Sequence, residues 1–236
     1  MLVEIAVQDL AGAATAAEAG ADRLELCTGL STGGLTPSAG LIASVVTVGL
    51  PVRVLVRCRE GDFAYLDEEI GLMAEDIRRS RDLGASGVVV GAVHRLGGRP
   101  RLDRAALSRL VGAAEGLPTV LHRASDVVGP TDTAETLAET GIAEVLTSGG
   151  GSTVAEGMAG LGRLAGLLGG DRIIAGGGLA VADVAELATF GVGAVHASAS
   201  RSVTGGPTGP GAATGRSVTA AERVAALVAA VREVSA

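Results

Sequence analysis

The 236-residue sequence contains no lysine, asparagine or tryptophan, and only one Tyr and two Phe. Without lysine, Schiff-base chemistry and a lysine-anchored pyridoxal phosphate are excluded. The few aromatic side chains and a formal net charge of −7 argue against nucleic-acid binding, which relies on clustered cations and stacking surfaces. Because 47% of the residues are hydrophobic, the core must be aliphatic.

Long apolar runs are also missing, since none approaches the ~18 residues of a membrane span. The chain enters a strand-like segment at residue 2 without a charged leader. We therefore expect a cytoplasmic protein, in which Cys27 and Cys58 are reduced thiols. The sequence has no Cys-x-x-Cys, His-Glu-x-x-His, P-loop or Gly-x-Ser-x-Gly motif, so no common motif identifies its chemistry.

Short apolar, β-branched segments alternate with helix-like segments along the whole chain. This alternation is typical of a parallel sheet with helical crossovers. It predicts a single-domain (β/α)₈ TIM barrel over residues 1–236, with an open parallel sheet as the alternative because strand order cannot be read from sequence. The predicted strands are 2–7, 23–26, 52–57, 87–91, 119–122, 144–147, 172–175 and 194–198. The predicted helices are 10–19, 38–48, 67–83, 103–114, 131–140, 154–168, 181–190 and 220–234.

One segment stands apart in composition. Residues 202–217 are rich in glycine and also contain proline, which predicts a flexible loop after the eighth strand. A lid over the barrel mouth is the alternative, because βα loops are where barrels place functional residues.

All three histidines and both cysteines lie at or just after the carboxyl end of a predicted strand. In a barrel these ends meet on one rim, which is where barrel active sites lie. The two-residue period of a strand places Glu25 and Cys27 on one face, and we expect that face to line the lumen. The same period turns Cys58 outward if Arg57 faces inward.

The rim gathers groups that suit a small anionic or phosphorylated ligand. Arginine forks bind phosphate or carboxylate bidentately, and the glycines after the seventh strand expose backbone N–H groups. Glu25, His122 or Asp126 could move a proton beside a bound anion. The predicted anion-binding residues are Arg57, Arg59, Asp62, Arg123, Thr147, Ser148, Gly149, Gly177, Gly178, His196 and Ser198.

Structural roles for the same residues stay open. The acids Glu4, Glu25, Asp62 and Asp126 could form one ion network with the arginines, and the glycines could simply make tight turns. Cys27 could be an inert buried thiol. His94, which precedes a turn-like stretch, is read as a loop residue.

Six segments are informative when taken together. They are Gly20 to Cys27, Gly33 to Ser38, Arg57 to Phe63, His122 to Asp126, Leu146 to Gly149 and Val195 to Ser198. These segments resemble the CutC family, known as copper homeostasis proteins, and the resemblance covers most of the chain up to about residue 200. It implies a (β/α)₈ barrel, a cytoplasmic location, frequent self-association into homo-oligomers and a role in copper handling.

The sequence departs from the family at Cys58 and Glu60, where the family often has proline and glycine. Only Cys27 matches a family cysteine position, so a copper site built from further cysteines cannot be carried over. Two hypotheses result. The first is a Cu(I)-binding protein with Cys27 as the principal ligand and Cys58 or a rim histidine as the second, since Cu(I) prefers soft thiolates. The second is a barrel enzyme acting on a small anionic or phosphorylated metabolite, with the copper role indirect or absent.

Overall fold

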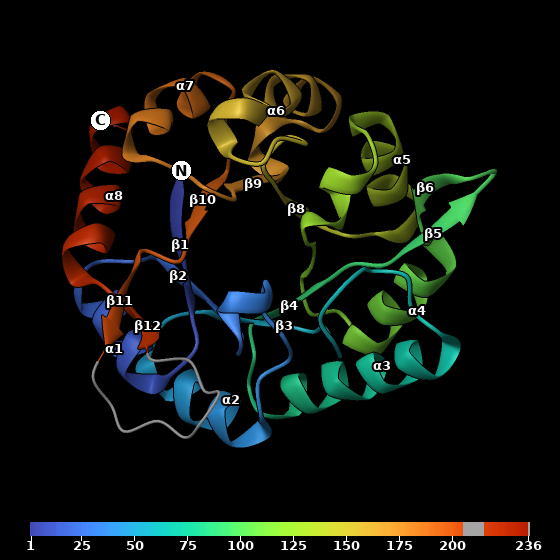
Figure 1. The fold of residues 1–236 in the computed structure, drawn as a ribbon, viewed down its shortest axis with the longest axis horizontal. Helices are drawn as coiled ribbons and strands as arrows, with labels where there is room; N and C mark the ends of the chain where they lie inside the picture. The colour runs from blue at the N-terminus through green and yellow to red at the C-terminus, as the bar shows by residue number, and fades with distance from the viewer. Residues whose placement is uncertain (205–214, 236) are drawn as a thin grey trace.

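The computed structural model describes residues 1–204 and 215–235, and its central feature is a closed barrel of eight parallel strands (Figure 1). The barrel confirms the predicted (β/α)₈ fold and excludes the open sheet. Around the barrel the strands follow the order β1-β10-β9-β8-β7-β4-β3-β2. Their bounds are β1 Leu2–Val7, β2 Arg23–Leu26, β3 Val52–Leu55, β4 Gly87–Val90, β7 Thr119–Leu121, β8 Glu144–Thr147, β9 Ile173–Gly176 and β10 Ala194–Ala197.

Helices surround the barrel as an outer ring, as Figure 1 shows. Among the described residues, no helix is long and apolar enough to cross a membrane. The helices are α1 Leu10–Glu18, α2 Ala39–Val45, α3 Asp67–Asp82, α4 Arg104–Ala114, α5 Pro130–Thr140, α6 Val154–Leu168, α7 Val184–Thr189 and α8 Ala221–Val234. Short 3₁₀ segments follow α2 at Val46–Val48 and precede α7 at Val181–Asp183.

Alternation along each strand creates two separate apolar clusters. Residues such as Val54 and Val56 face outward and pack with the helices in the main core. Their neighbours face the lumen, where they form a smaller plug. The luminal cluster contains Cys27, Leu55, Val89, Val120, Leu146, Ile174 and Ala194. This layer closes part of the barrel interior and leaves the carboxyl ends of the strands for polar groups.

The β4–α4 connection carries a hairpin that the sequence analysis did not predict. Strands β5 (Val93–Leu96) and β6 (Arg99–Leu102) pair antiparallel and project from the helix ring (Figure 1). Gly97 and Gly98 connect them, with φ of 57° and 81°. Positive φ at both central residues is typical of a two-residue hairpin turn. His94 is therefore a strand residue, which corrects its interpretation as a loop residue.

A second hairpin occupies the two ends of the predicted loop 202–217. Strands β11 (Ser200–Thr204) and β12 (Gly215–Thr219) pair antiparallel beside α1. Residues 202–204 and 215–217 are therefore strand and not loop. The remainder of the predicted loop, 205–214, lies outside the described residues.

Candidate functional site

A cavity of about 420 Å³ opens at the carboxyl ends of the barrel strands. Half of the residues that line it were predicted as site residues. These are Glu25, Arg57, His122, Arg123, Gly177, Gly178, His196 and Ser198. The others are mostly apolar: Ala6, Leu30, Gly33, Leu55, Phe63, Leu146, Leu179 and Ala197. The cavity therefore combines apolar walls with a few convergent polar groups, as small-molecule sites do.

Buried charges lie deeper in the lumen than most of the cavity lining. Arg23 Nε contacts Glu4 Oε2, and Arg53 Nη1 lies 3.7 Å from the same oxygen. Arg53 also pairs with Glu144 through two bonds of 2.8 and 2.5 Å. Two arginines and two glutamates thus neutralise one another across strands β1, β2, β3 and β8. Of the acids expected in a structural ion network, Glu4 belongs to this group, but its arginine partners are Arg23 and Arg53 and not the arginines of the rim.

Glu4 links the buried network to the cavity through His196. His196 Nδ1 lies 2.8 Å from Glu4 Oε1, and the two residues are directly opposite each other in the β1–β10 pairing. Burial opposes ionisation of Glu4, yet the hydrogen bond and charge of His196, together with Arg23 and Arg53, lower its pKa to about 2. Glu4 is therefore a carboxylate at neutral pH. It holds the imidazole of His196 at the cavity edge.

Glu25 faces the cavity with less support from the protein. Its side chain is buried, and its Oε2 atom has no hydrogen-bond partner. Burial is the largest influence and raises the pKa of Glu25 to about 6, with His196 opposing that shift and Glu4 adding to it. Burial acts to lower the pKa of His196, but Glu25 and Glu4 raise it overall. The predicted proton-transfer residue Glu25 thus has a pKa near neutrality.

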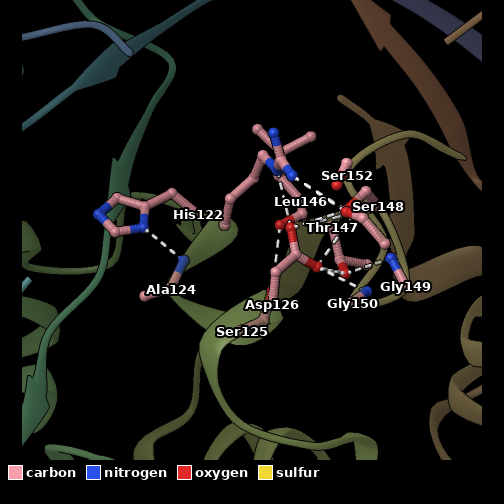
Figure 2. Close-up of polar contacts among 12 residues, drawn as sticks. His122, Ala124, Ser125, Asp126, Leu146, Thr147, Ser148, Gly149, Gly150 and Ser152 are labelled. Carbon is pink, nitrogen blue, oxygen red and sulfur yellow. Dashed lines mark hydrogen bonds and ion pairs between the residues drawn. The ribbon is translucent and has the colours of Figure 1, made fainter. Parts of the chain in front are cut away.

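His122 forms the opposite wall of the cavity. Its Nδ1 accepts a hydrogen bond of 3.0 Å from the Ala124 N–H (Figure 2), so the proton of the neutral ring is on Nε2. Nε2 is buried and has no hydrogen-bond partner. Burial and the charge of Arg57 lower the pKa of His122 to about 3. His122 is therefore a neutral hydrogen-bond donor, and this state does not suit the predicted general base.

Arg57 connects two loops that border the cavity. Its guanidinium donates to the carbonyls of Thr32, Gly34 and Gly61 at 2.8 to 3.0 Å, and it lies 5.2 Å from the Phe63 ring centroid. Arg57 Nε is buried and unpaired. Most of the hydrogen-bonding capacity of this guanidinium thus holds the loops together, while one buried N–H is left without a partner.

Arg123 and Asp126 form an ion pair over the turn after β8. Arg123 Nε lies 2.7 Å from Asp126 Oδ2, and Arg123 Nη2 donates to the Ser148 hydroxyl at 3.0 Å. Arg123 lines the cavity, and its side chain is 41% exposed. The bonds to Asp126 and Ser148 orient the arginine, while enough of the guanidinium is accessible to meet a ligand.

Asp126 itself does not line the cavity. Figure 2 shows its carboxylate enclosed by the Thr147–Gly150 turn. It accepts hydrogen bonds from the Thr147 hydroxyl at 2.5 Å, from the Ser148 N–H and hydroxyl, and from the Gly150 N–H at 3.1 Å. Thr147, Ser148 and Gly149 likewise lie outside the cavity lining. Asp126 therefore positions Arg123 and the turn, in place of the predicted acid–base role.

The glycine segment after β9 brings the backbone close to Arg123. A Cβ atom on Gly177 would lie 2.8 Å from Arg123 Cζ, and the φ of Gly177 is 104°. Only glycine tolerates both the close approach and this backbone conformation. The tight-turn interpretation is therefore correct for Gly177, and the same turn places its backbone along the cavity.

Arg59 and Asp62 do not reach the cavity. Arg59 Nε lies 2.6 Å from Glu69 on α3, and Arg59 Nη1 lies 3.2 Å from Asp62. The guanidinium also stacks on Tyr65 at 5.0 Å from the ring centroid. The structure thus places both residues in a partly exposed surface cluster, away from the predicted anion site.

The two cysteines lie on opposite sides of the barrel wall. Cys27 is fully buried in the luminal cluster, where its thiol lies 3.8 Å from the Val7 carbonyl. Cys58 is half-buried against the outer core. Burial raises the pKa of both thiols. The predicted opposite facing is confirmed, and the residues present do not fit a two-thiolate Cu(I) site.

Several site-forming residues escaped the sequence analysis. Arg23 and Glu144 complete the buried charge network, and both lie two residues before a luminal position on their strand, so the two-residue period could have found them. Gly91 was read only as part of a strand. A Cβ there would lie 2.2 Å from the His122 ring, so Gly91 provides the space for this histidine.

Fold and cavity together define a (β/α)₈ barrel that has, at the carboxyl ends of its strands, a cavity of the size of a small ligand with a few polar groups in its wall. The CutC family model matches residues 1–201, and the chain belongs to the CutC family. A family protein CutC from Agrobacterium fabrum is 43% identical over 203 residues, covering 85% of this chain and 80% of the relative. One from Caulobacter vibrioides is 41% identical over 204 residues, covering 84% and 81%.

Solved structures agree with this assignment. The crystal structure of a candidate copper homeostasis protein, CutC from Streptococcus agalactiae, matches with a TM-score of 0.75 and 28% identity, covering 84% of this chain and 98% of that one. Thiamine phosphate pyrophosphorylase from Pyrococcus furiosus matches with a TM-score of 0.64 at 14% identity, covering 100% and 96%. The second likeness concerns the fold alone, because one barrel supports many unrelated reactions.

Proposed function

We propose that this protein takes part in copper homeostasis in the cytoplasm. The support is family membership, together with the Streptococcus agalactiae relative whose name refers to copper homeostasis. Both cysteines are free, which suits a reducing compartment. A homo-oligomer is part of the same proposal, because self-association is common in the resembling family.

Direct Cu(I) binding is the finer form of this proposal, with Cys27 as the thiolate. Burial disfavours the ionised thiol of Cys27, so the free energy of Cu(I) binding has to exceed the cost of ionising that thiol. Titration with Cu(I) against a competing chelator tests it in wild type, Cys27→Ser and Cys58→Ser. We expect Cys27→Ser to weaken binding most, because Cys58 lies on the other side of the barrel wall. Equal affinity in wild type and Cys27→Ser would overturn direct binding through this thiol.

A second candidate function is the binding or conversion of a small anionic metabolite in the cavity. One specific observation favours it: the cavity-lining residues His122 and Arg57 each retain a buried N–H without a partner. Each buried donor without a partner costs roughly 1–3 kcal/mol. A ligand that accepts hydrogen bonds from both of these N–H groups would therefore bind more tightly. Arg123, exposed at the cavity, would supply the positive charge.

Inorganic phosphate is a suitable probe for this second function. We expect calorimetry to detect binding in wild type, and Arg123→Gln to weaken it roughly 10- to 100-fold, because one charge-assisted hydrogen bond contributes about 1.5–3 kcal/mol. Arg109→Gln is the matched control, since Arg109 pairs with Asp67 on the outer helices. Equal phosphate affinity in wild type and Arg123→Gln would count against the anion function.

A further inference from the structure

Three neighbouring strands bring hard metal-ligand atoms together beneath the cavity. Glu4 is on β1, Glu25 on β2 and His196 on β10, and β1 pairs with both of the other strands. One carboxylate oxygen from each glutamate and one ring nitrogen of His196 all lie within 4.8 Å of one another. Among the described residues, this is the one group of three or more His, Cys or acidic side chains with that geometry.

We infer that Glu4, Glu25 and His196 form a binding site for a divalent cation at the floor of the cavity. The second observation, beyond the cluster itself, is the Oε2 atom of Glu25. This atom is buried and has no hydrogen-bond partner, and Glu25, which lines the cavity, is 5% exposed as a residue. A buried carboxylate oxygen without a donor is costly. A bound cation would supply the missing partner.

The contact between His196 and Glu4 supplies two of the ligand atoms. His196 Nδ1 lies 2.8 Å from Glu4 Oε1, which is close to the separation of two ligand atoms on one ion that lies about 2 Å from each. A cation would therefore replace the hydrogen bond between these two atoms, with Glu25 as the third ligand and the ring proton on Nε2.

The surrounding charges are compatible with a divalent ion. Glu4, Glu25 and Glu144 face two guanidiniums, Arg23 and Arg53, so the ionised cluster has one excess negative charge when His196 is neutral. Both arginines approach Glu4 through Oε2, leaving Oε1 to the His196 side. Adding a divalent cation would leave one positive charge at the floor. An anionic ligand entering from the cavity could balance that charge and occupy an open coordination position.

The donor set defines the class of metal. Two carboxylates and an imidazole suit Zn²⁺, Mn²⁺, Fe²⁺ or Cu²⁺, whereas Cu(I) prefers thiolate and thioether ligands. Three protein ligands also leave a position free, as in catalytic zinc sites. The inference therefore differs from the Cu(I) proposal in metal, in ligands and in position, and each can hold without the other.

Zn²⁺ calorimetry on the full chain in phosphate-free buffer tests the site. We expect one ion per chain in wild type, and at least about tenfold weaker binding in Glu25→Gln and in His196→Gln, because each loses a ligand. His94→Gln and Glu69→Gln are matched controls on the β5–β6 hairpin and on α3. Absence of Zn²⁺ binding in wild type, or unchanged affinity in both ligand variants, would overturn the inference.

Two further measurements distinguish this site from a cysteine-bound ion and from a folding defect in the variants. Co²⁺ bound to wild type should give a visible spectrum without a thiolate charge-transfer band, and such a band would assign the ion to a cysteine instead. Because the ligand variants could fold poorly, the melting temperature of wild type is also compared in Zn²⁺ and in EDTA. A ligand that binds only the folded state must raise that temperature, and no rise would contradict the site. The Cu(I) titration of Cys27→Ser tests the other proposal, and its result does not bear on this site.

Discussion

Arg53 on β3 reaches across the barrel lumen to Glu144 on β8, where its two terminal nitrogens lie 2.8 and 2.5 Å from the two carboxylate oxygens. The side chain of Arg53 is 7% exposed and that of Glu144 is 24% exposed. This bidentate pair bridges strands that are far apart around the barrel. Removing either member would take away the short partner of the other buried charge and leave only a longer contact, 3.7 Å from Arg53 to Glu4 or 3.6 Å from Glu144 to Arg23.

Replacing Arg53 is therefore expected to destabilise the barrel. Arg53→Met should lower the free energy of unfolding by about 3 kcal/mol, at the lower end for a broken buried pair because Glu144 is partly exposed. The double variant Arg53→Met/Glu144→Met should recover part of the lost unfolding free energy, since neither charge of the pair is then buried without its partner. Urea unfolding of all four combinations measures the coupling, and strictly additive losses would argue that the pair does not act as a unit.

The effects of substitutions at Gly91 and His122 on stability should also be coupled, here through a steric contact. A Cβ on Gly91 would overlap the His122 ring at 2.2 Å, so Gly91→Ala should cost roughly 1–3 kcal/mol in unfolding free energy. In a His122→Ala background the cost should largely disappear. Gly112→Ala on α4 is the control, because an added Cβ there meets nothing within 4 Å. An equal cost of Gly91→Ala with and without the imidazole would contradict the steric origin of the effect.

The pKa of His122 predicts a pH dependence of stability. Burial and Arg57 hold the folded-state pKa at about 3, well below the 6.5 of a free imidazole. Below pH 6.5 the imidazole of His122 binds a proton in the unfolded chain but stays neutral in the folded protein. The contribution of the neutral imidazole to the unfolding free energy is therefore fully present above pH 6.5 and is lost as the pH falls. The slope approaches ~1.4 kcal/mol per pH unit.

His122→Asn tests this assignment, because asparagine can still accept from the Ala124 N–H but does not titrate in this range. Unfolding free energies between pH 4.5 and 8 should fall less steeply in His122→Asn than in wild type. His94→Asn controls for the loss of one histidine from the chain. Parallel pH profiles for wild type and His122→Asn would show that this imidazole is not the source of the slope.

Much of this architecture could be predicted from sequence because it repeats. Seven of the eight barrel strands contain β-branched residues, each barrel strand is followed along the chain by a helix, and all eight predicted strands are found. The β5–β6 hairpin was missed because its strands carry arginines and little apolar alternation. Its Gly97–Gly98 turn was the available signal.

The site was predictable in position but less so in detail. Residues at strand ends had to meet on the rim, and Glu25, His122 and His196 do so. Whether a side chain is free or already paired depends on partners distant in sequence, such as Glu69 for Arg59. Local spacing carries no information on those contacts, so Arg59 and Asp126 looked equivalent to residues that do line or face the cavity.

Asp126 gives the last prediction, because its carboxylate is enclosed by donors. Asp126→Asn puts an amide N–H₂ among the N–H and O–H groups of Arg123, Thr147 and Ser148. We expect the variant to be destabilised by about 1–3 kcal/mol. Hydrogen exchange should also be faster at the Gly150 amide, which in wild type donates a hydrogen bond to Asp126 at 3.1 Å. Asp67→Asn, at an exposed ion pair, should change stability by less than about 1 kcal/mol. If Asp126→Asn kept wild-type stability and Gly150 protection, the carboxylate would not hold the turn, and its acid–base role would have to be reconsidered.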